Sequence, residues 1–184
     1  YAWQGGMESG TALADVLTGT VNPSGKLTDT IAINYEDYPS SQSFGGQSFN
    51  AYTEDIYVGY RYFETFAPDR VLYPFGFGLS YTRFRLSSHA AVSGNQITVS
   101  TDVENIGDEA GREVVQVYVD LPCGKLGNPK RVLAGFQKSH LLNPGQQETV
   151  EITLDLCDLA SFDDTGASGA KFAFVLEPGS YCIQ

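Results

Sequence analysis

Acidic side chains are the strongest candidates for chemistry in the first part of the sequence, where six of them lie in or beside loops. These residues are Glu36, Asp37, Glu54, Asp55, Glu64 and Asp69. Two carboxylates that meet in space can hydrolyse a glycosidic bond, one acting as acid and base and the other as nucleophile. The sequence alone does not pair these six groups, and most loop carboxylates are simply solvated. We therefore assign no catalytic residue.

Three other motifs lack the residues that their chemistry requires. The pair Gly25-Lys26 in NPSGKL suggests a phosphate-binding loop, but Leu27 stands where a Ser or Thr would hold magnesium. The chain has no G-x-S-x-G segment, so a serine hydrolase mechanism has no recognisable nucleophile. The segment DDTG at 163–166 is too short for a calcium-binding loop and is typical of a turn.

The cysteines and histidines do not form a metal-binding pattern. Neither His89 nor His140 lies at ligand spacing from a cysteine or from the other histidine, so we expect no metal and no other cofactor. Cys123, Cys157 and Cys182 are odd in number and widely spaced. Cys157 and Cys182 could pair across neighbouring strands, but we expect three free thiols, which favour a cytoplasmic location over an oxidising one.

Composition and charge restrict the class of protein. The hydrophobic fraction of 42% in 184 residues is typical of a globular chain. The formal net charge of −11 argues against a nucleic-acid partner, because binding to a phosphate backbone requires clustered Lys and Arg. No apolar run has the length of a membrane span, so we expect no membrane partner. The opening YAWQGGMESG resembles the end of a buried strand more than a signal peptide, so we expect a piece of a longer chain.

Residues 1–78 begin with the periodicities of an α/β layer. Apolar residues three and four apart in SGTALADVLT predict a short helix over 9–18, with Ser9 or Thr11 as its cap and Gly19 after its end. The segment NPSG is typical of a turn, since proline fixes φ and glycine allows a positive φ. The segment KLTDTIAI that follows it predicts a strand.

Two further segments complete this first part. Residues 36–54 are polar and rich in Ser, Gly and Asn, and they predict a long loop of the kind that often carries function. In DIYVGYRYF (55–63) every second residue from Ile56 to Tyr62 is apolar or aromatic, which predicts a strand. Strand, helix, turn and strand, in this order, fit an incomplete α/β layer that is too small to close a core alone.

From Leu79 onward the pattern is that of consecutive strands. Apolar residues alternate in QITVSTDVEN, REVVQVYVDL and TVEITLDL, with turn sequences such as NIGDEAG and NPGQQ between them. Further strands are expected near 80–86, 131–137, 171–176 and 180–184. About seven strands are typical of an immunoglobulin-like sandwich. We predict a mostly β fold, in which an incomplete α/β segment (1–78) precedes an immunoglobulin or fibronectin type III-like β-sandwich (79–184).

The segment LYPFGFGLSYTRF (72–84) lies between the two parts and is rich in rings and glycines. We interpret it as a domain junction. Its rings, Tyr73, Phe75, Phe77 and Tyr81, offer a surface on which the β domain would hold residues 1–78. Apolar side chains of that incomplete layer need a partner, so self-association through 1–78 is the alternative.

Several segments, in the order in which they occur, resemble glycoside hydrolase family 3, the family of β-glucosidases and β-xylosidases. AWQGGMESGTALADVLTGTVNPSGKL, YTEDIYVGYRYF and VLYPFGFGLSYTRF are similar to blocks at the end of its α/β-sandwich domain. VENIGDEAGREVVQVYV, LAGFQK, LNPGQQETVEITL and LASFD are similar to its fibronectin type III-like domain. The resemblance covers essentially the whole chain. Thr28 and Asp55 depart from it, since the family usually has Pro at the first position and commonly Gly at the second.

The resemblance implies a non-catalytic C-terminal fragment of a β-glycosidase with a retaining mechanism. The family's nucleophilic Asp belongs to a (β/α)-barrel domain, and its acid/base Glu lies upstream of the Trp-Gly-Gly block. No segment quoted above matches either residue, so no catalytic position is transferred and the chain is expected to be inactive alone. Its implied partners are the catalytic domains of the parent enzyme, and loop 36–54 could border the sugar pocket there.

Two functions of other classes are the alternatives, a free-standing carbohydrate-binding module and a scaffold module of immunoglobulin type. Tryptophan is the best platform for a sugar ring, and the only one in the chain is Trp3, outside the β domain. A scaffold sandwich would not need the α/β signature of residues 1–78. The fragment of a glycosidase is therefore the favoured interpretation.

Overall fold

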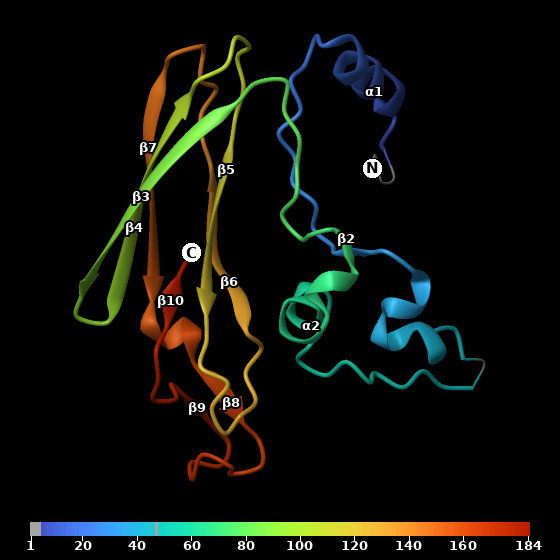
Figure 1. Ribbon diagram of the computed structural model, residues 1–184, viewed down its shortest axis with the longest axis vertical. Coiled ribbons are helices and arrows are strands. Elements are labelled where there is room, and N and C mark those ends of the chain that lie inside the picture. Colours follow the sequence, from blue (N-terminus) through green and yellow to red (C-terminus); the bar gives the residue numbers. More distant parts are fainter. Residues whose placement is uncertain (1–4, 47) are drawn as a thin grey trace.

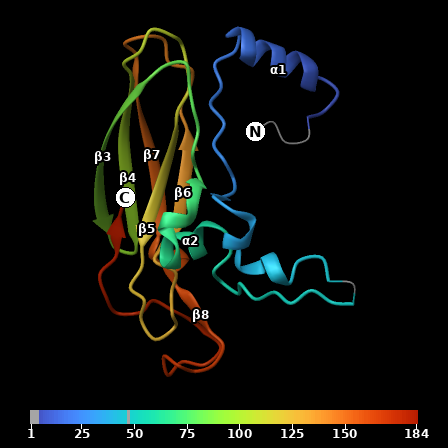
Figure 2. The same ribbon diagram turned by 45° about the vertical axis from the view of Figure 1, so that its right-hand side comes forward.

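The computed structural model describes residues 5–46 and 48–184, and it has two parts of different kinds. Figure 1 shows an elongated sandwich of strands and, beside it, a smaller part built from short helices and extended chain. In both views, helix α2 (Tyr60–Phe66) is the helix nearest the sandwich, whereas helix α1 (Ser9–Thr18) lies further out (Figures 1 and 2). Trp3 lies outside the described residues.

The helix predicted at the start of the chain is confirmed as α1. Glu8 is its N-cap residue, instead of either of the predicted serine and threonine caps. At the other end Gly19 has a φ of 79°, and its N–H donates to the carbonyl of Val16 over 3.1 Å. This left-handed conformation strongly favours glycine, which explains why the helix ends there.

The strand predicted in KLTDTIAI is reduced to β1 (Ile31–Ala32), which pairs antiparallel with β2 (Val71–Tyr73). The strand predicted over 55–63 is wrong, because a turn and then α2 occupy these residues. Gly59 has a φ of 58° and interrupts any extended run. In α2 the hydroxyl of Tyr60 bonds the sandwich, while the ring of Phe63 meets Tyr38 edge to face.

The long loop 36–54 is present, and short 3-10 helices give it local order. These are η1 (Tyr35–Asp37) and η2 (Pro39–Gln42), and a third, η3 (Pro68–Arg70), follows α2. The side chain of Asp37 accepts the N–H of Asn34 over 2.9 Å, which caps the first of them. The loop is therefore shaped mainly by its own side chains.

Antiparallel strands build the rest of the chain, as the alternation predicts. One sheet has the order β3-β4-β7, the second has the order β10-β5-β6, and β8 pairs with β9. The strands are β3 (Phe84–Ser93), β4 (Gln96–Asn105), β5 (Val114–Asp120), β6 (Arg131–Lys138), β7 (Gln147–Asp155), β8 (Ser161–Asp163), β9 (Ala173–Val175) and β10 (Cys182–Ile183). The fold is a mostly β, fibronectin type III-like sandwich. β8 has no predicted counterpart, since three residues are too few to show an alternation.

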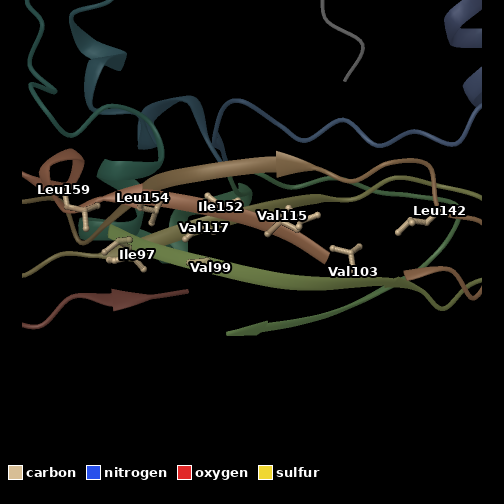
Figure 3. Packing of buried hydrophobic residues seen from close by; sticks show 11 residues of the cluster. Ile97, Val99, Val103, Val115, Val117, Leu142, Ile152, Leu154 and Leu159 are labelled. Carbon is tan, nitrogen blue, oxygen red and sulfur yellow. The ribbon is translucent and has the colours of Figure 1, made fainter. Parts of the chain in front are cut away.

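Aliphatic side chains between the two sheets form the core (Figure 3). Val103 and Val119 are completely buried, and Val117 and Val150 are nearly so. They occupy alternate positions of β4, β5 and β7, because neighbouring side chains of a strand point to opposite faces. The predicted inward faces of these three strands are therefore confirmed.

Gly135 sets how closely β6 approaches β7. A Cβ atom at this position would lie 2.7 Å from Cγ2 of Ile152 and 3.0 Å from Cδ2 of Leu154. Real Cβ atoms do not come this close to a side chain, so the sheets depend on the absence of a side chain here. β6 consequently lies directly opposite β7 across the core.

The turn predicted at DDTG is confirmed, and the buried side chain of Asp163 organises it. The carboxylate accepts the N–H groups of Gly166 and Ser168 over 2.6 and 2.8 Å, and the hydroxyl of Ser168 over 2.6 Å. These hydrogen bonds, led by that of the Ser168 hydroxyl, hold the pKa of Asp163 well below its ordinary value. The carboxylate thus serves the turn itself.

The cysteines are distributed over the surface of the β domain. All three are exposed and free in the structure. Cys157 lies on the 3-10 helix η4 (Leu156–Leu159) rather than on a strand, and Cys182 lies on β10. In the part of the chain that the structure describes, no helix is long and apolar enough to span a bilayer.

We predict that Leu154→Ala lowers the free energy of unfolding by about 2–5 kcal/mol, because the loss of a buried leucine leaves a cavity between the sheets. Leu154 is 3% exposed. Leu86→Ala is the matched control: Leu86 lies in the same sheet but is 48% exposed, so its loss should cost about 1 kcal/mol or less. Chemical denaturation followed by circular dichroism measures both changes, and equal losses would contradict this assignment of the core.

Candidate functional site

The structure gives most of the six candidate carboxylates a structural partner. Asp37 and Asp69 flank the same guanidinium group, with oxygens 3.7 and 3.8 Å from nitrogens of Arg70. Glu54 accepts a hydrogen bond from the hydroxyl of Ser40 over 3.2 Å. These three carboxylates therefore stabilise the loop region around η1, η2 and η3.

The other three candidates differ from one another. Glu64 on α2 lies 3.3 Å from Arg131 of the sandwich, so it belongs to the contact between the two parts. Glu36 and Asp55 are exposed. Asp55 has a φ of 50°, a left-handed conformation that suits glycine and is tolerated by Asp better than by most residues. This agrees with the expectation that relatives commonly have glycine there.

Loop 36–54 exposes large apolar side chains. Phe44, Phe49 and Tyr52 are 77%, 79% and 93% exposed. The same loop borders a shallow pocket of about 370 Å³ with acidic, hydroxyl and aromatic side chains in its wall. Rings this exposed carry apolar surface that is typical of a contact with another protein surface.

Tyr60 of α2 makes the central contact between residues 1–78 and the sandwich. Its hydroxyl accepts the backbone N–H of Leu133 on β6 over 2.9 Å. Its ring stacks on Phe75 with the centroids 4.6 Å apart and the planes inclined by 28°. The same ring meets Tyr118 of β5 edge to face at 6.3 Å. Aromatic pairs of this geometry stabilise beyond the area that they bury.

Gly76 brings the aromatic segment 72–84 onto the sheet. It has a φ of 78°, its carbonyl accepts a hydrogen bond from Gln116 Nε2 over 3.2 Å, and its N–H donates to the carbonyl of Leu27. A Cβ atom here would overlap Oε1 of Gln116 and lie 2.8 Å from the hydroxyl of Tyr118. Only glycine fits this approach, so the junction predicted for residues 72–84 has a physical basis.

Asn22, in the segment NPSG, connects residues 1–78 to the start of the β domain by side-chain hydrogen bonds. Its Oδ1 accepts the hydroxyl of Ser80 and the N–H of Tyr81, both over 2.9 Å, and its Nδ2 donates to the carbonyl of Ala110 over 3.0 Å. The hydroxyl of Tyr81 donates to the carbonyl of Val16 at the end of α1. The turn predicted at NPSG is wrong, because residues 22–27 form no turn and Gly25 has no positive φ, but the contacts of Asn22 give this segment a structural role.

Two charged clusters cross the junction. Arg131 lies 2.7 Å from Asp120 and 3.3 Å from Glu64, so one guanidinium group joins β5, β6 and α2. The hydrogen bond to Asp120 raises the pKa of Arg131 above its already high ordinary value.

Lys26 lies 2.5 Å from Glu113, and both side chains are mostly buried. Partly buried pairs are screened less by salt than surface pairs.

Two further hydrogen bonds join side chains of residues 1–78 to the backbone of the sandwich. The hydroxyl of Tyr57 donates to the carbonyl of Gly127. The hydroxyl of Thr65 accepts the N–H of Lys130 over 3.0 Å. These bonds extend the contact of the α2 region along the chain segment before β6.

A cleft of about 500 Å³ lies below the junction, between the turn before α2 and the lower end of the sandwich. Its wall includes Asp55, Arg61, Asp158, Asp164 and Phe162. Asp55 is the one candidate carboxylate among the residues that line it. Within the described ranges, no group of three or more His, Cys, Asp or Glu residues is arranged to hold a metal ion. The cleft is therefore an acidic and partly apolar depression without a defined ligand.

The position of Tyr118 at the junction shifts the pKa of its hydroxyl. Burial raises its pKa from 10.0 to about 12, with smaller contributions from Tyr60 and the negative charge of Glu64, partly offset by Arg131. Between pH 10 and pH 12 the unfolded chain loses this proton while the folded chain keeps it. The free energy of unfolding consequently falls as the pH rises through this range, and below pH 10 the contribution is fully present.

We predict that Tyr118→Phe makes the alkaline fall in the free energy of unfolding shallower between pH 10 and pH 12, because the variant has no proton to lose at this position. Tyr52→Phe is the control, since Tyr52 is 93% exposed and its loss should leave the slope unchanged. Urea denaturation at several pH values measures the slope. A Tyr118→Phe curve parallel to that of the unsubstituted chain would contradict the prediction.

Comparison with known families matches both parts of the chain. Residues 1–81 match the glycosyl hydrolase family 3 C-terminal domain, and residues 113–184 match the fibronectin type III-like domain. The two matches follow one another in the order expected from the sequence.

Known β-glucosidases are similar over nearly the whole chain. A β-glucosidase of Ruminococcus albus is 50% identical over 181 residues, which are 98% of this chain and 19% of that protein. β-Glucosidase A of Butyrivibrio fibrisolvens is 48% identical over 98% of this chain and 24% of that protein. The chain thus spans about a fifth to a quarter of the length of these relatives.

Solved structures agree in the arrangement of both parts. The β-glucosidase of Paenibacillus barengoltzii superposes with a TM-score of 0.94 at 50% identity, covering 98% of this chain and 20% of that one. β-Glucosidase 3B of Thermotoga neapolitana, solved in complex with glucose, gives a TM-score of 0.88 at 43% identity, covering 98% of this chain and 25% of that one. The chain therefore belongs to glycoside hydrolase family 3.

Proposed function

We propose that the chain is a non-catalytic C-terminal part of a family 3 β-glycosidase and that it supports catalytic domains elsewhere in the longer protein. The whole protein would hydrolyse β-glucosides or related glycosides by a retaining mechanism. The observation that carries the proposal is the junction centred on Tyr60, which fixes residues 1–78 on the sandwich by defined hydrogen bonds and stacked rings. We assign no catalytic, metal-binding or cofactor-binding residue to this chain.

We also propose a boundary between residues 1–78 and 79–184. Within the described part of 1–78, the buried hydrophobic residues are Ala32 and Phe63, whereas 79–184 contains the whole aliphatic cluster between the sheets. Residues 1–78 thus lack a core that could stabilise them independently. The second part has one, in agreement with the size at which a sandwich folds alone.

The remaining catalytic domains are the proposed partners of residues 1–78. Exposed large apolar side chains of residues 1–78 occur on and beside α1 and in the loop region, and we call this set of residues the outer face. The outer face consists of Met7, Leu13, Leu17, Val21, Ile33, Tyr35, Phe44, Phe49 and Tyr52. Exposed apolar surface of this extent favours contact with another protein surface. In the isolated chain the same face is expected to drive self-association.

We predict that a chain of residues 79–184 unfolds in one cooperative transition, whereas a chain of residues 1–78 is poorly folded. The first contains the aliphatic core, and the second loses Leu133 and Tyr118, the partners of Tyr60. Circular dichroism melts of the two chains measure this difference. A sharp transition of 1–78 as a monomer would contradict both the boundary and the dependence on the junction.

We predict that the chain alone hydrolyses aryl β-glucosides and aryl β-xylosides no faster than buffer does. Co-expression with the Ruminococcus albus β-glucosidase from which the matching segment has been deleted should restore hydrolysis by that enzyme. The two polypeptides should also co-purify. Turnover by the chain alone that survives repurification and is lost on substitution of one carboxylate in 36–69 would overturn the proposal, and so would failure of the two soluble polypeptides to associate.

We predict that Phe49→Asp weakens this association at least about tenfold, because it places a charge on the outer face, where it must be desolvated on contact. Phe174→Asp is the matched control: Phe174 is 74% exposed and Phe49 is 79% exposed, but Phe174 lies on β9 of the β domain and does not belong to the outer face. Titration with the deleted enzyme followed by light scattering measures both affinities. Equal weakening by the two substitutions would show that the outer face is not the contact surface.

A further inference from the structure

An arginine without a partner lines the cleft of about 500 Å³ below the junction. Arg61 of α2 is half-buried and belongs to the wall of this cleft. Among the described residues, its guanidinium group forms no ion pair and no hydrogen bond, whereas that of Arg131 is held by two carboxylates. A guanidinium group carries five N–H donors and keeps its charge at any pH of interest. The donors of Arg61 are therefore available to a ligand in the cleft.

Three exposed carboxylates line the same cleft, and each comes from a different element. Asp55 precedes α2, Asp158 lies on η4 and Asp164 follows β8. Within the ranges that the structure describes, none of the three forms an ion pair, and they are not arranged to hold a metal ion. The carboxylates would repel an anion, and a cation would leave the guanidinium group of Arg61 unpaired. The wall therefore best suits a neutral ligand whose groups both donate and accept hydrogen bonds.

An aromatic ring borders this polar wall. Phe162 on β8 lines the cleft and is 51% exposed, and its ring meets that of Phe174, its cross-strand partner on β9, with the centroids 5.2 Å apart. Both neighbours of Phe162 in the chain are anchored. The hydroxyl of Ser161 donates to Oδ1 of Asn128 over 2.6 Å, and Asp163 is buried in its turn. The ring is thus held in place with half of its surface free, so a ligand that stacks on it pays little conformational entropy.

We propose that this cleft, called the lower cleft below, binds a neutral oligosaccharide of β-linked pyranose units. A pyranose ring with equatorial hydroxyls has flat faces of C–H groups and a rim of hydroxyls that both donate and accept. The lower cleft offers the complementary set: the ring of Phe162 for one face, Arg61 for hydroxyl oxygens and the carboxylates for hydroxyl protons. In both views β8 lies below α2, so the two sides of the site come from the two parts of the chain (Figures 1 and 2).

The inference rests on the proposed function, because a glycosidase works among chains of such sugars. The lower cleft would let this part of the protein hold a glycan on which the whole enzyme acts. Its volume lies at the lower end of the range for small-molecule sites, so it has room for a short stretch of glycan only. Phenylalanine is also a smaller platform than tryptophan. We expect weak binding, with a Kd on the order of 1 mM.

Three tetrasaccharides with the same β-1,4-linked backbone test the charge of the ligand. They are cellotetraose, which is neutral, its analogue with a carboxylate at every C6, and the chitosan tetramer with a free amine at every C2. Each is titrated into the 184-residue chain at about pH 5.5, where the aspartates remain ionised. The amide signals of Ser161 and Phe162, followed by NMR, should shift with cellotetraose. The two charged sugars should bind at least about tenfold more weakly.

Two pairs of variants test the two sides of the site. Phe162→Leu keeps the apolar contact with Phe174 but removes the flat ring, so it should weaken cellotetraose binding about threefold or more. Phe136→Leu is its control, since Phe136 is 68% exposed but lies on β6 outside the wall of the cleft. Arg61→Met removes the donors and keeps the stem, and it should weaken binding by a similar factor. Arg83→Met is its control, because Arg83 is exposed and lies elsewhere.

Calorimetric melts of all four variants separate a loss of binding from a loss of folding. If either Phe162→Leu or Arg61→Met fails to fold, the other decides the outcome.

Several results would overturn the proposal. One is the absence of shifts at Ser161 and Phe162 with cellotetraose at about 20 mM, and another is equal binding of the three tetrasaccharides. A third is equal weakening by a cleft variant and its control. A fourth is self-association of the chain that Phe162→Leu abolishes and cellotetraose does not displace, since a second copy would then occupy the cleft. All these measurements use the chain alone, so a failure here is distinct from a failure to associate with the catalytic domains.

Discussion

The position of residues 1–78 depends on the contact that Tyr60 makes with β5 and β6, on the side of these strands that faces away from the core. Its ring lies between Phe75 and Tyr118, and its hydroxyl accepts a backbone N–H that the sheet would otherwise leave to water. Few other side chains of this part are buried, so its arrangement comes from the surface beneath it and not from a core of its own.

The β domain, in contrast to residues 1–78, is stabilised by a core of its own. Its strands are held by one aliphatic cluster, and its loops are held by buried polar side chains that satisfy several backbone groups at once. Asp163 does so for the turn after β8, and Asn105 does so for the turn after β4, where its amide donates to the carbonyls of Glu109 and Leu142. The sandwich therefore offers a surface stabilised by its own core, and residues 1–78, which bury few side chains, are held on that surface.

Sequence periodicity predicted the sandwich well, because alternation at β4, β5 and β7 reports burial directly. It failed at residues 55–63, where apolar and aromatic residues at every second position mimic a strand, although Gly59 interrupts the run with a positive φ and α2 begins at Tyr60. The role of Gly76 as a close-approach residue could be foreseen from LYPFGFGLSYTRF, but its partners Gln116 and Tyr118 could not.

Four hydrogen bonds of the junction have the same arrangement, which bears on how such proteins diverge. In each of them residues 1–78 contribute a side chain and the sandwich contributes a main-chain group. The pairs are Asn22 with Ala110, Tyr57 with Gly127, Thr65 with Lys130 and Tyr60 with Leu133. Main-chain groups persist through substitution as long as the path of the chain is kept. These four contacts therefore tolerate changes of side chain in the sandwich, whereas the contacts made by the side chains of Gln116, Tyr118 and Arg131 depend on residue type.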